Sequence, residues 1–304
     1  MNYPVVPQRG HDHEDQHQAS STPWGLMTVL IGAVIGLYGP VLLGLWSDWL
    51  GDDNYAHGVL VPPFVAWLIW RRRRDFQRLD RRPSYVGALL VAVGLCMYLL
   101  GQVGFEFFVT RASLLVVLSG IVVQLLGWRH LRLCAFPLVL LALAIPLPAL
   151  IFNEIALPMQ LLASQFGVAT LHALDIAAIR EGNIILLERA TLEVAEACSG
   201  IRSLISLGTL ALVYGYLGRQ SIAARALVVL AVFPVVIVAN GLRVASAGAV
   251  AHAYGAQAAA GFLHSFSGWL FFGSAVLMLV AVERGAAMLR WPGPPSPPEA
   301  MRPA

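Results

Sequence analysis

Eight runs of apolar residues divide the chain, and they constrain its fold more than any other feature. A helix needs roughly 20 apolar residues to cross a hydrocarbon core about 30 Å thick. We therefore expect an all-α polytopic membrane protein with about eight transmembrane helices. The expected spans are Trp24–Leu45, Gly58–Trp70, Tyr85–Gly101, Ala112–Gly127, Leu133–Phe152, Ile201–Leu217, Ala223–Leu242 and Phe266–Val282.

The balance of apolar and charged residues excludes the common soluble classes. Hydrophobic residues make up 58% of the chain and charged residues 12%, whereas soluble domains average about 45–50% and about 25%. So few charges cannot cover a water-facing surface of this size. A soluble enzyme, a disordered protein and a nucleic-acid-binding domain are therefore excluded, and the expected environment is the lipid bilayer with no nucleic-acid partner.

The positions of the basic residues predict the orientation, because short cytoplasmic loops concentrate Lys and Arg. All 20 basic residues are arginines, and the largest group, residues 71–82, follows the second span. Further arginines follow the fourth, sixth and eighth spans, whereas the short loops after the first and third hold only Arg111. Both termini are therefore expected in the cytoplasm.

The ends of the chain differ in composition from the apolar region between them. Residues 1–22 are polar, and residues 291–304 are rich in proline, which cannot continue a helix. We expect a disordered cytoplasmic tail at 1–22, a membrane domain at 23–290 and a Pro-rich cytoplasmic tail at 291–304.

One connection is much longer than the others and lies on the outer side in this orientation. Within Asn153–Glu196, helical spacing over Ile155–Ile179 predicts an amphipathic helix on the membrane surface. Alternating β-branched residues over Ile184–Val194, introduced by Gly182-Asn183, predict a short strand or hairpin. This extracytoplasmic segment leads the chain to Cys198.

Three polar residues converge at the outer ends of the last three spans. Cys198 lies at the outer start of the sixth span, Arg243 at the outer end of the seventh and His264 at the outer start of the eighth. Taken singly, an arginine at a helix end often only extends to the interface, and an apolar-helix cysteine is usually a small hydrophobe, as we interpret Cys96 and Cys134. The shared depth of Cys198, Arg243 and His264 on neighbouring spans favours a functional site, since ionisable residues in membrane helices are often functional.

These three residue types suit thiol acyl transfer. The thiolate is the nucleophile, and a neighbouring cation or a helix N-terminus lowers the pKa of a thiol such as Cys198. His264 can carry protons to a leaving group and from an acceptor. Arg243 keeps its charge and can hydrogen-bond the oxyanion of a tetrahedral intermediate. Nothing in the spacing of the three cysteines predicts a metal site or a cofactor.

The segments ACSGIR, NGLRV and HSFSGW, in this order, resemble the motifs of the exosortase/archaeosortase family of membrane transpeptidases. The upstream NYAHGVLVPP is similar to that family's segment at the start of its second helix. The resemblance implies that Cys198, Arg243 and His264 form a catalytic triad in a bacterial cytoplasmic membrane. It also implies substrates that are membrane-anchored proteins with a C-terminal sorting signal of PEP-CTERM type: a Pro-containing motif, a helix and a basic cluster. The family is associated with exopolysaccharide-producing bacteria.

Four neighbours are candidates for supporting roles. Asn240 lies one helical turn before Arg243 and is placed to orient it. Arg202 follows Cys198 by one turn and either binds a substrate carboxylate or pairs with Glu196. His57 either lines the site or has a capping or interfacial role. Ser199 and Gly200 indicate a helix start just before the sixth span, where free backbone N–H groups would add oxyanion donors.

Two other functions use the same residues differently. A cysteine intramembrane protease that only hydrolyses would differ in its acceptor, which a sequence does not reveal. A transporter or exopolysaccharide-export subunit would line a solute path with polar residues through the midplane, and the third, fourth, fifth and eighth spans carry almost none. A membrane cysteine transpeptidase is the leading interpretation.

Overall fold

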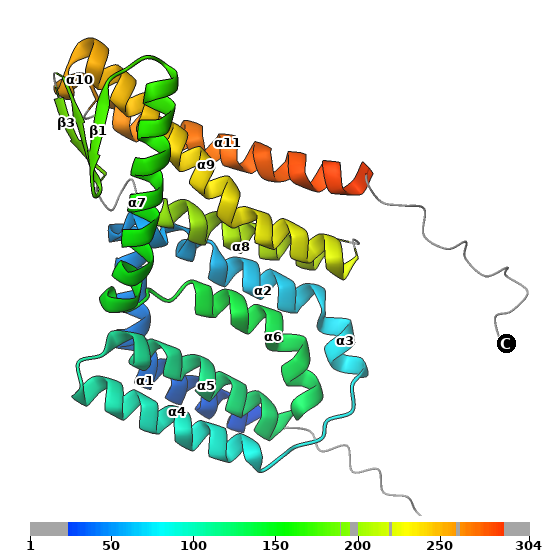
Figure 1. Cartoon of the computed structure of the whole chain (residues 1–304). Helices are drawn as coiled ribbons and strands as arrows, with labels where there is room; N and C mark the ends of the chain where they lie inside the picture. The colour runs from blue at the N-terminus through cyan, green and yellow to red at the C-terminus, as the bar shows by residue number, and fades with distance from the viewer. Residues whose placement is uncertain (1–23, 189, 195–199, 219–220, 260–261, 289–304) are drawn as a thin grey trace, which may run out of the picture. The chain divides into compact units, whose positions relative to one another are not determined.

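The structure, a computed structural model, describes residues 24–188, 190–194, 200–218, 221–259 and 262–288 (Figure 1). The tails predicted at 1–22 and 291–304 lie outside these residues, as do the side chains of residues 24, 26–27, 262–266 and 286–288. The chain forms two compact units, residues 1–43 and 44–304. The first is described as the N-terminal part of helix α1 (Trp24–Gly51), whose exposed Val29, Ile31 and Ile35 suit contact with lipid.

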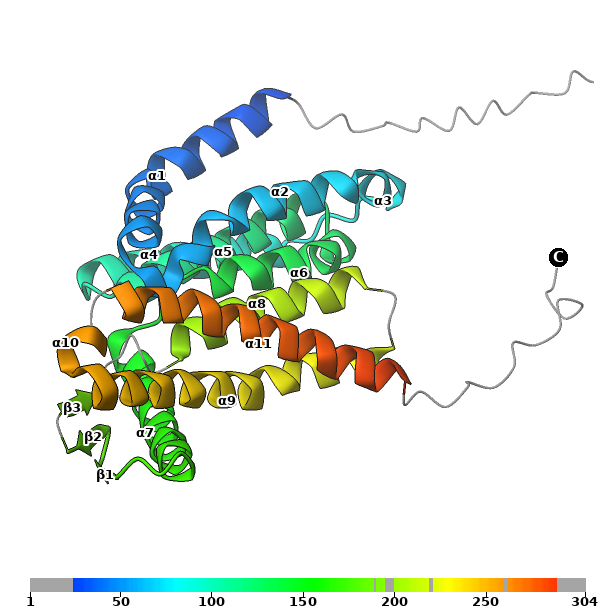
Figure 2. The same cartoon turned by 90° about the horizontal axis from the view of Figure 1, so that it is seen from above.

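The second unit contains the end of α1 and all later elements, most of them helices (Figure 2). Its first half comprises η1 (Asp53–Val59), α2 (Val61–Arg71), α3 (Arg73–Arg78), α4 (Val86–Val103), α5 (Phe107–Leu125) and α6 (Trp128–Leu143). Its second half comprises α7 (Ala149–Ala173), β1 (Ala178–Glu181), β2 (Ile184–Leu187), β3 (Ala190–Glu193), α8 (Ile201–Leu217), α9 (Ile222–Tyr254), α10 (Ala256–Ala259) and α11 (Phe262–Met288).

Several helices carry the apolar surface of a multi-pass membrane protein. In the described part of the chain, five stretches are long and apolar enough to cross a membrane: Thr28–Gly51, Val86–Val103, Phe107–Leu125, Ile222–Tyr254 and Ser267–Gly285. Helix α8 is apolar but shorter, and α2 and α6 have 11 and 16 residues. The all-α membrane class is therefore supported, while the count of eight spans stays a prediction.

The expected fifth span, Leu133–Phe152, is not one continuous helix. Helix α6 ends at Leu143 and α7 begins at Ala149, because Pro146 and Pro148 lie between them. Two aromatic side chains satisfy the freed backbone groups: Trp49 Nε1 donates to Ala144 O at 2.8 Å, and Tyr55 Oη accepts from Leu147 N at 3.0 Å. The prediction of a single helix here was wrong. The chain turns between α6 and α7, and these two hydrogen bonds stabilise the turn.

The segment before Cys198 has a shorter helix and one more strand than the sequence predicts. Helix α7 ends at Ala173 instead of Ile179, and Asp175 adopts a left-handed φ of 57° just after it. Residues predicted as the end of that helix instead form β1, so the sheet is an antiparallel meander β1-β2-β3. Its register pairs Ile179 with Leu186 and Ile185 with Leu192. The predicted hairpin is thus extended to three strands.

Helix α7 packs along α9 and crosses the direction of α4, α5 and α6 steeply (Figures 1 and 2). Its buried residues recur every three or four positions, from Phe152 through Met159 and Ala163 to Leu171. Its outward face exposes Leu150 and Leu157. This one-sided burial fits the amphipathic helix that the spacing predicts, and its position on the membrane surface stays a prediction.

Helices α4 and α5 approach closely through small residues. Gly87, Gly94 and Gly101 recur every seventh position on α4, and all three are buried. A Cβ on Gly87 would overlap the backbone N of Gln124, and one on Gly94 would lie 2.6 Å from Val117 Cγ2. Without a hydrophobic driving force between helices in lipid, such close backbone packing is a main source of association.

We expect Gly87→Ala to destabilise the protein by roughly 1–3 kcal/mol, because the added methyl group overlaps backbone that cannot rotate away. Gly273→Ala on α11 is the matched control, since a Cβ there meets nothing within 4 Å. That change should be neutral or stabilising by about 0.4–1 kcal/mol. Denaturation of the detergent-solubilised protein measures both, and equal stability of the two variants would contradict the packing described here.

Candidate active site

The start of α8 lies directly against α9. Gly200 precedes α8 with a left-handed φ of 80°, which favours glycine. A Cβ on Gly200 would lie 3.2 Å from the side chain of Asn240, which is buried on α9. Cys198 and Ser199 immediately precede Gly200 and lie outside the described residues. The chain therefore reaches this point of α9 just after the predicted nucleophile.

Arg243 on α9 lies close to α11. It is half-buried one helical turn after Asn240, and its own backbone oxygen accepts a hydrogen bond from Ser246 Oγ at 2.8 Å. A Cβ on Gly268 would lie 3.8 Å from a terminal guanidinium nitrogen of Arg243. Gly268 follows His264 by one turn on α11, so the two positions share a helix face. The His264 side chain itself lies outside the described part of the structure.

Helices α8, α9 and α11 pack side by side (Figure 2). Gly200 and Gly268 lie near the starts of α8 and α11, but Asn240 and Arg243 lie within α9, which continues to Tyr254 beyond the expected end of the seventh span at Leu242. At 1.5 Å per residue, Asn240 is about 27 Å along α9 from Ile222. Gly268 is likewise about 24 Å along α11 from Arg284, and Leu217 about 24 Å along α8 from Ile201. Each helix thus separates the candidate site from its other end by roughly the thickness of a hydrocarbon core.

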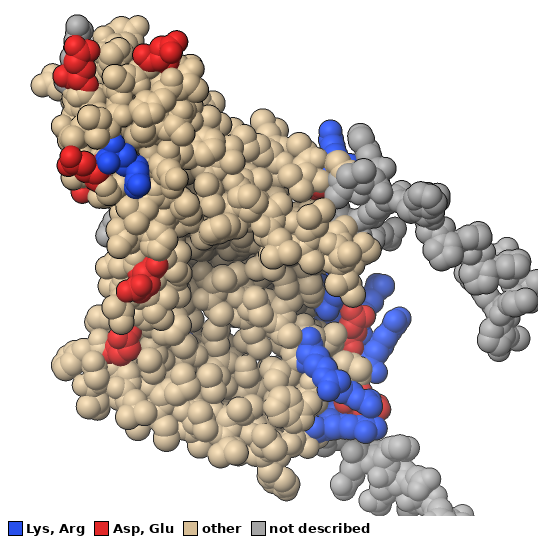
Figure 3. All heavy atoms as spheres, viewed as in Figure 1, with Lys and Arg blue, Asp and Glu red and all other residues tan. Residues whose placement is uncertain are grey.

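The two ends of the second unit differ in charge. Most arginines gather at one end and most acidic residues at the other (Figure 3). Arg225 and Arg284 lie at the ends of α9 and α11 that are remote from Asn240 and Gly268. The candidate site is therefore at the end opposite to the arginines.

The sheet fixes the chain just before the segment that carries the predicted nucleophile. Val194 N donates to Asn183 O at 2.9 Å, and Asn183 Nδ2 donates to Val194 O at 3.3 Å. Ser164 Oγ on α7 also donates to Gly182 O at 3.0 Å. The sequence indicates only a turn at Asn183. In the structure its two hydrogen bonds to Val194 fix the position of the chain four residues before Cys198.

Arg202, in the first turn of α8, contacts η1. Its guanidinium lies 3.1 Å from the Asp53 carboxylate, and the two side chains are 44% and 77% exposed. The alternative partner considered from the sequence, Glu196, lies outside the described residues. An ion pair this exposed typically stabilises a protein by only about 0–1 kcal/mol, so the contact leaves Arg202 available to a substrate carboxylate. Asp53 was missed, although it directly precedes the NYAHG segment.

His57 connects η1 to the corner between α6 and α7. Its Nε2 lies 3.4 Å from Leu143 O, and among the described residues its buried Nδ1 has no hydrogen-bond partner. Burial lowers the pKa of His57, a change that the contact with Leu143 O partly opposes. The imidazole is therefore neutral at pH 7, with Nε2 as donor and Nδ1 as a vacant acceptor. Since Asp53 on the same element contacts Arg202, His57 belongs to the neighbourhood of the α8 start.

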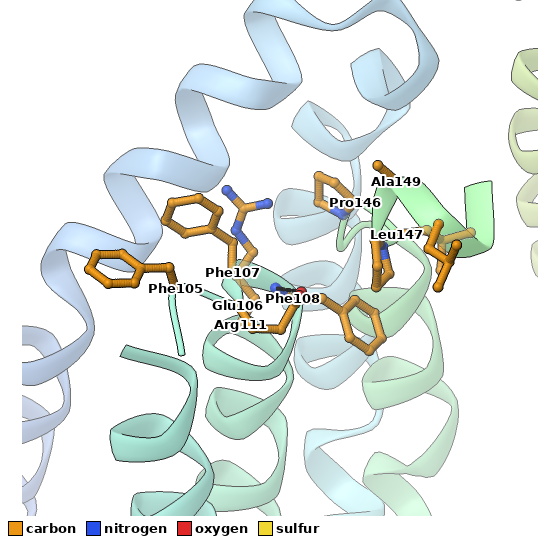
Figure 4. Close-up of a pocket in the computed structure, with 10 residues that line it drawn as sticks. Phe105, Glu106, Phe107, Phe108, Arg111, Pro146, Leu147 and Ala149 are labelled. Atoms are coloured by element: carbon orange, nitrogen blue, oxygen red, sulfur yellow. Dashed lines mark hydrogen bonds between the residues drawn. The ribbon is translucent and has the colours of Figure 1, made fainter. Parts of the chain in front are cut away.

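A hollow of about 380 Å³ lies elsewhere, between the α4–α5 turn and the α6–α7 corner (Figure 4). Phe105, Phe107 and Phe108 line one side and Pro146 to Leu150 the other. Arg111 borders it, but its guanidinium is bound to Asp48 at 2.5 Å and its side chain is only 11% exposed. None of the predicted site residues that the structure describes lines this hollow, and we assign it no role in the chemistry.

The described residues contain no group of three or more His, Cys, Asp or Glu side chains that could hold a metal ion.

Comparison with known protein families decides the membership of the chain. Residues 46–281 match the family model described as transmembrane exosortase (Exosortase_EpsH). The chain belongs to this family. Comparisons with curated proteins and with solved structures give no match. The exosortase match extends from the end of α1 into α11 and so includes all three segments that carry Cys198, Arg243 and His264.

Proposed function

We propose that this exosortase is a membrane cysteine transpeptidase or peptidase with Cys198, Arg243 and His264 as its catalytic residues. The observation that carries the proposal is the close approach of α8, α9 and α11: Gly200 lies against Asn240, and Arg243 lies beside Gly268. Because Cys198 is two residues from Gly200 and His264 one turn from Gly268, the described neighbours of all three residues are close in space.

The first half-reaction forms a thioester. The Cys198 thiolate attacks the carbonyl carbon of the scissile peptide bond, and the electron pair moves to the carbonyl oxygen. Arg243 and backbone N–H groups at the start of α8 stabilise this oxyanion. As the oxyanion collapses, the C–N bond breaks and the His264 imidazolium donates its proton to the leaving amine.

The second half-reaction releases the product. Neutral His264 removes a proton from an acceptor amine, hydroxyl group or water, and the acceptor attacks the thioester carbonyl. The C–S bond then breaks and Cys198 leaves as a thiolate. An amine or hydroxyl acceptor makes the enzyme a transpeptidase or transferase, and water makes it a hydrolase.

The supporting residues have separate positioning roles in this scheme. Asn240 holds the entry of α8 through its contact with Gly200 and precedes Arg243 by one turn. Ser199 contributes a backbone N–H at the helix start. Arg202 exchanges Asp53 for a carboxylate of the substrate, and His57 holds η1 against the α6–α7 corner through its contact with Leu143 O.

The substrates in this proposal are membrane-anchored proteins with a C-terminal sorting signal of PEP-CTERM type. We place the enzyme in the bacterial inner membrane, with both termini in the cytoplasm and the site facing the periplasm. The collection of arginines at the end remote from the site supports this orientation (Figure 3). Co-expression with a tagged membrane protein carrying a candidate signal tests the function, because cleavage changes the mobility of the tagged protein.

The orientation makes a prediction about labelling by a membrane-impermeant thiol reagent. In a variant without the native cysteines, Glu181→Cys on exposed β1 should react in intact spheroplasts. Gln77→Cys on exposed α3 is the matched control and should react only after lysis. The reverse pattern would overturn the orientation and the periplasmic position of the site.

A further inference from the structure

Four exposed arginines follow the second predicted span and have no carboxylate partner in the described part of the chain. We call them the α2–α3 arginine cluster: Arg71, Arg73, Arg74 and Arg78. Residues 71–82 contain seven arginines against two acids, Asp75 and Asp80. The cluster therefore presents positive charge that the described residues do not neutralise (Figure 3).

Aromatic side chains hold part of this cluster in place. The Arg71 guanidinium lies over the Trp67 ring, 5.2 Å from its centroid, and that of Arg73 lies 4.4 Å from the Trp70 centroid. Arg73 Nη1 also donates to Trp70 O at 3.1 Å. Because stacking uses the face of a guanidinium and the bond to Trp70 O uses one N–H of Arg73, the remaining N–H groups can face an anion.

The helix that carries the cluster is fixed to its neighbours. His130 of α6 is buried, and its Nε2 lies 3.2 Å from Phe76 O of α3. Arg72, between α2 and α3, lies 4.9 Å from the centroid of Tyr216 on α8, which stacks on Phe136 of α6 at 3.6 Å. Contacts with α6 and α8 thus hold in place the segment that carries the arginines.

The surroundings of the cluster are typical of a membrane surface. Trp67, Trp70 and Tyr85 are exposed beside it, and Trp and Tyr concentrate at the interface between lipid and water. Helix α4, one of the helices long enough to span the membrane, begins directly after Tyr85. The anions concentrated at a membrane surface are lipid headgroups.

We propose that the α2–α3 arginine cluster binds the phosphate groups of anionic phospholipids. Guanidinium and phosphate form paired, charge-assisted hydrogen bonds that an ammonium group does not reproduce. Each basic residue near an anionic surface strengthens binding by on the order of fivefold. This role is independent of the proposed catalysis and of the side of the membrane on which the cluster lies.

Counting bound lipid on the detergent-solubilised full chain by native mass spectrometry tests the proposal. The protein is titrated with phosphatidylglycerol or with phosphatidylcholine. The wild type should prefer phosphatidylglycerol by roughly tenfold or more, and the preference should fall as salt rises. R73Q/R74Q/R78Q should lose most of it, whereas R180Q, a change at the exposed arginine on β1, should keep it.

A second variant keeps the test decisive, because loss of three charges can disturb membrane insertion. R73K/R74K/R78K retains the charges that guide insertion but loses the paired geometry, and its preference should fall severalfold. Equal retention of both lipids by the wild type would overturn the proposal, as would an unchanged preference in the lysine variant. Displacement of the bound lipid by millimolar inorganic phosphate would show a soluble-phosphate site and would also overturn it.

Discussion

Cys198→Ala is expected to abolish processing of a tagged substrate, whereas Cys96→Ala and Cys134→Ala should retain it. No other group in the proposed mechanism can form the thioester, so loss of this thiol removes the reaction. Cys96 is exposed on the apolar helix α4, and Cys134 is buried on α6 near Phe136, at the arginine-bearing end. Mobility of the co-expressed substrate measures all three variants.

The two alanine variants at Cys96 and Cys134 are the matched controls, because each removes one thiol from the same membrane domain. Membrane levels of the three variants should be compared before their activities. Full processing by Cys198→Ala would refute the assignment of the nucleophile. Loss of processing in either control, at normal protein levels, would place a second thiol in the mechanism.

Arg243→Lys is expected to lower the rate of processing by about 10²–10³, the typical cost of removing one oxyanion donor. Lysine keeps the positive charge but lacks the planar pair of N–H donors. Arg225→Lys is a suitable control, since Arg225 lies near the other end of α9, where its Nη2 donates to Gly218 O at 2.8 Å. Initial rates against one substrate distinguish them, and equal rates would remove Arg243 from the oxyanion site.

A variant at His264 distinguishes its two proposed roles, activation of Cys198 and release of the product from the thioester. In His264→Ala, a covalent adduct on Cys198 that accumulates and is sensitive to hydroxylamine would show that His264 acts chiefly in release. Absence of an adduct together with loss of activity would place its main role in activation of Cys198. Near wild-type turnover would contradict both roles.

The general architecture could be predicted because apolar length and motif order are local properties of the sequence. The expected span Ile201–Leu217 has the same bounds as α8, and the order of the three motifs indicated the family that the comparison shows. Gly200 lies against Asn240 and Gly268 lies near Arg243, whereas the convergence of Cys198, Arg243 and His264 themselves stays a prediction. Helix periodicity and loop charge are sufficient for this level of description.

The errors arose where apolar residues continue through a change of direction. Pro146 and Pro148 lie among isoleucine, leucine and alanine, so hydropathy alone extends the fifth span across the corner. Ile176 and Ile179 likewise continue the spacing of α7, although α7 ends at Ala173 and Ile179 lies in β1. The Asp53–Arg202 contact joins residues far apart in the chain, and no periodic pattern reveals such a pair.

The most direct test of the central claim is the interception of the thioester during processing by the wild-type enzyme. Hydroxylamine is added while a tagged substrate is cleaved, and the new C-terminus of the tagged fragment is identified by mass spectrometry. A thioester at Cys198 predicts a C-terminal hydroxamate with the wild type and no cleaved fragment with Cys198→Ala. Cleavage that yields no hydroxamate, or the same hydroxamate with Cys198→Ala, would contradict the proposed mechanism.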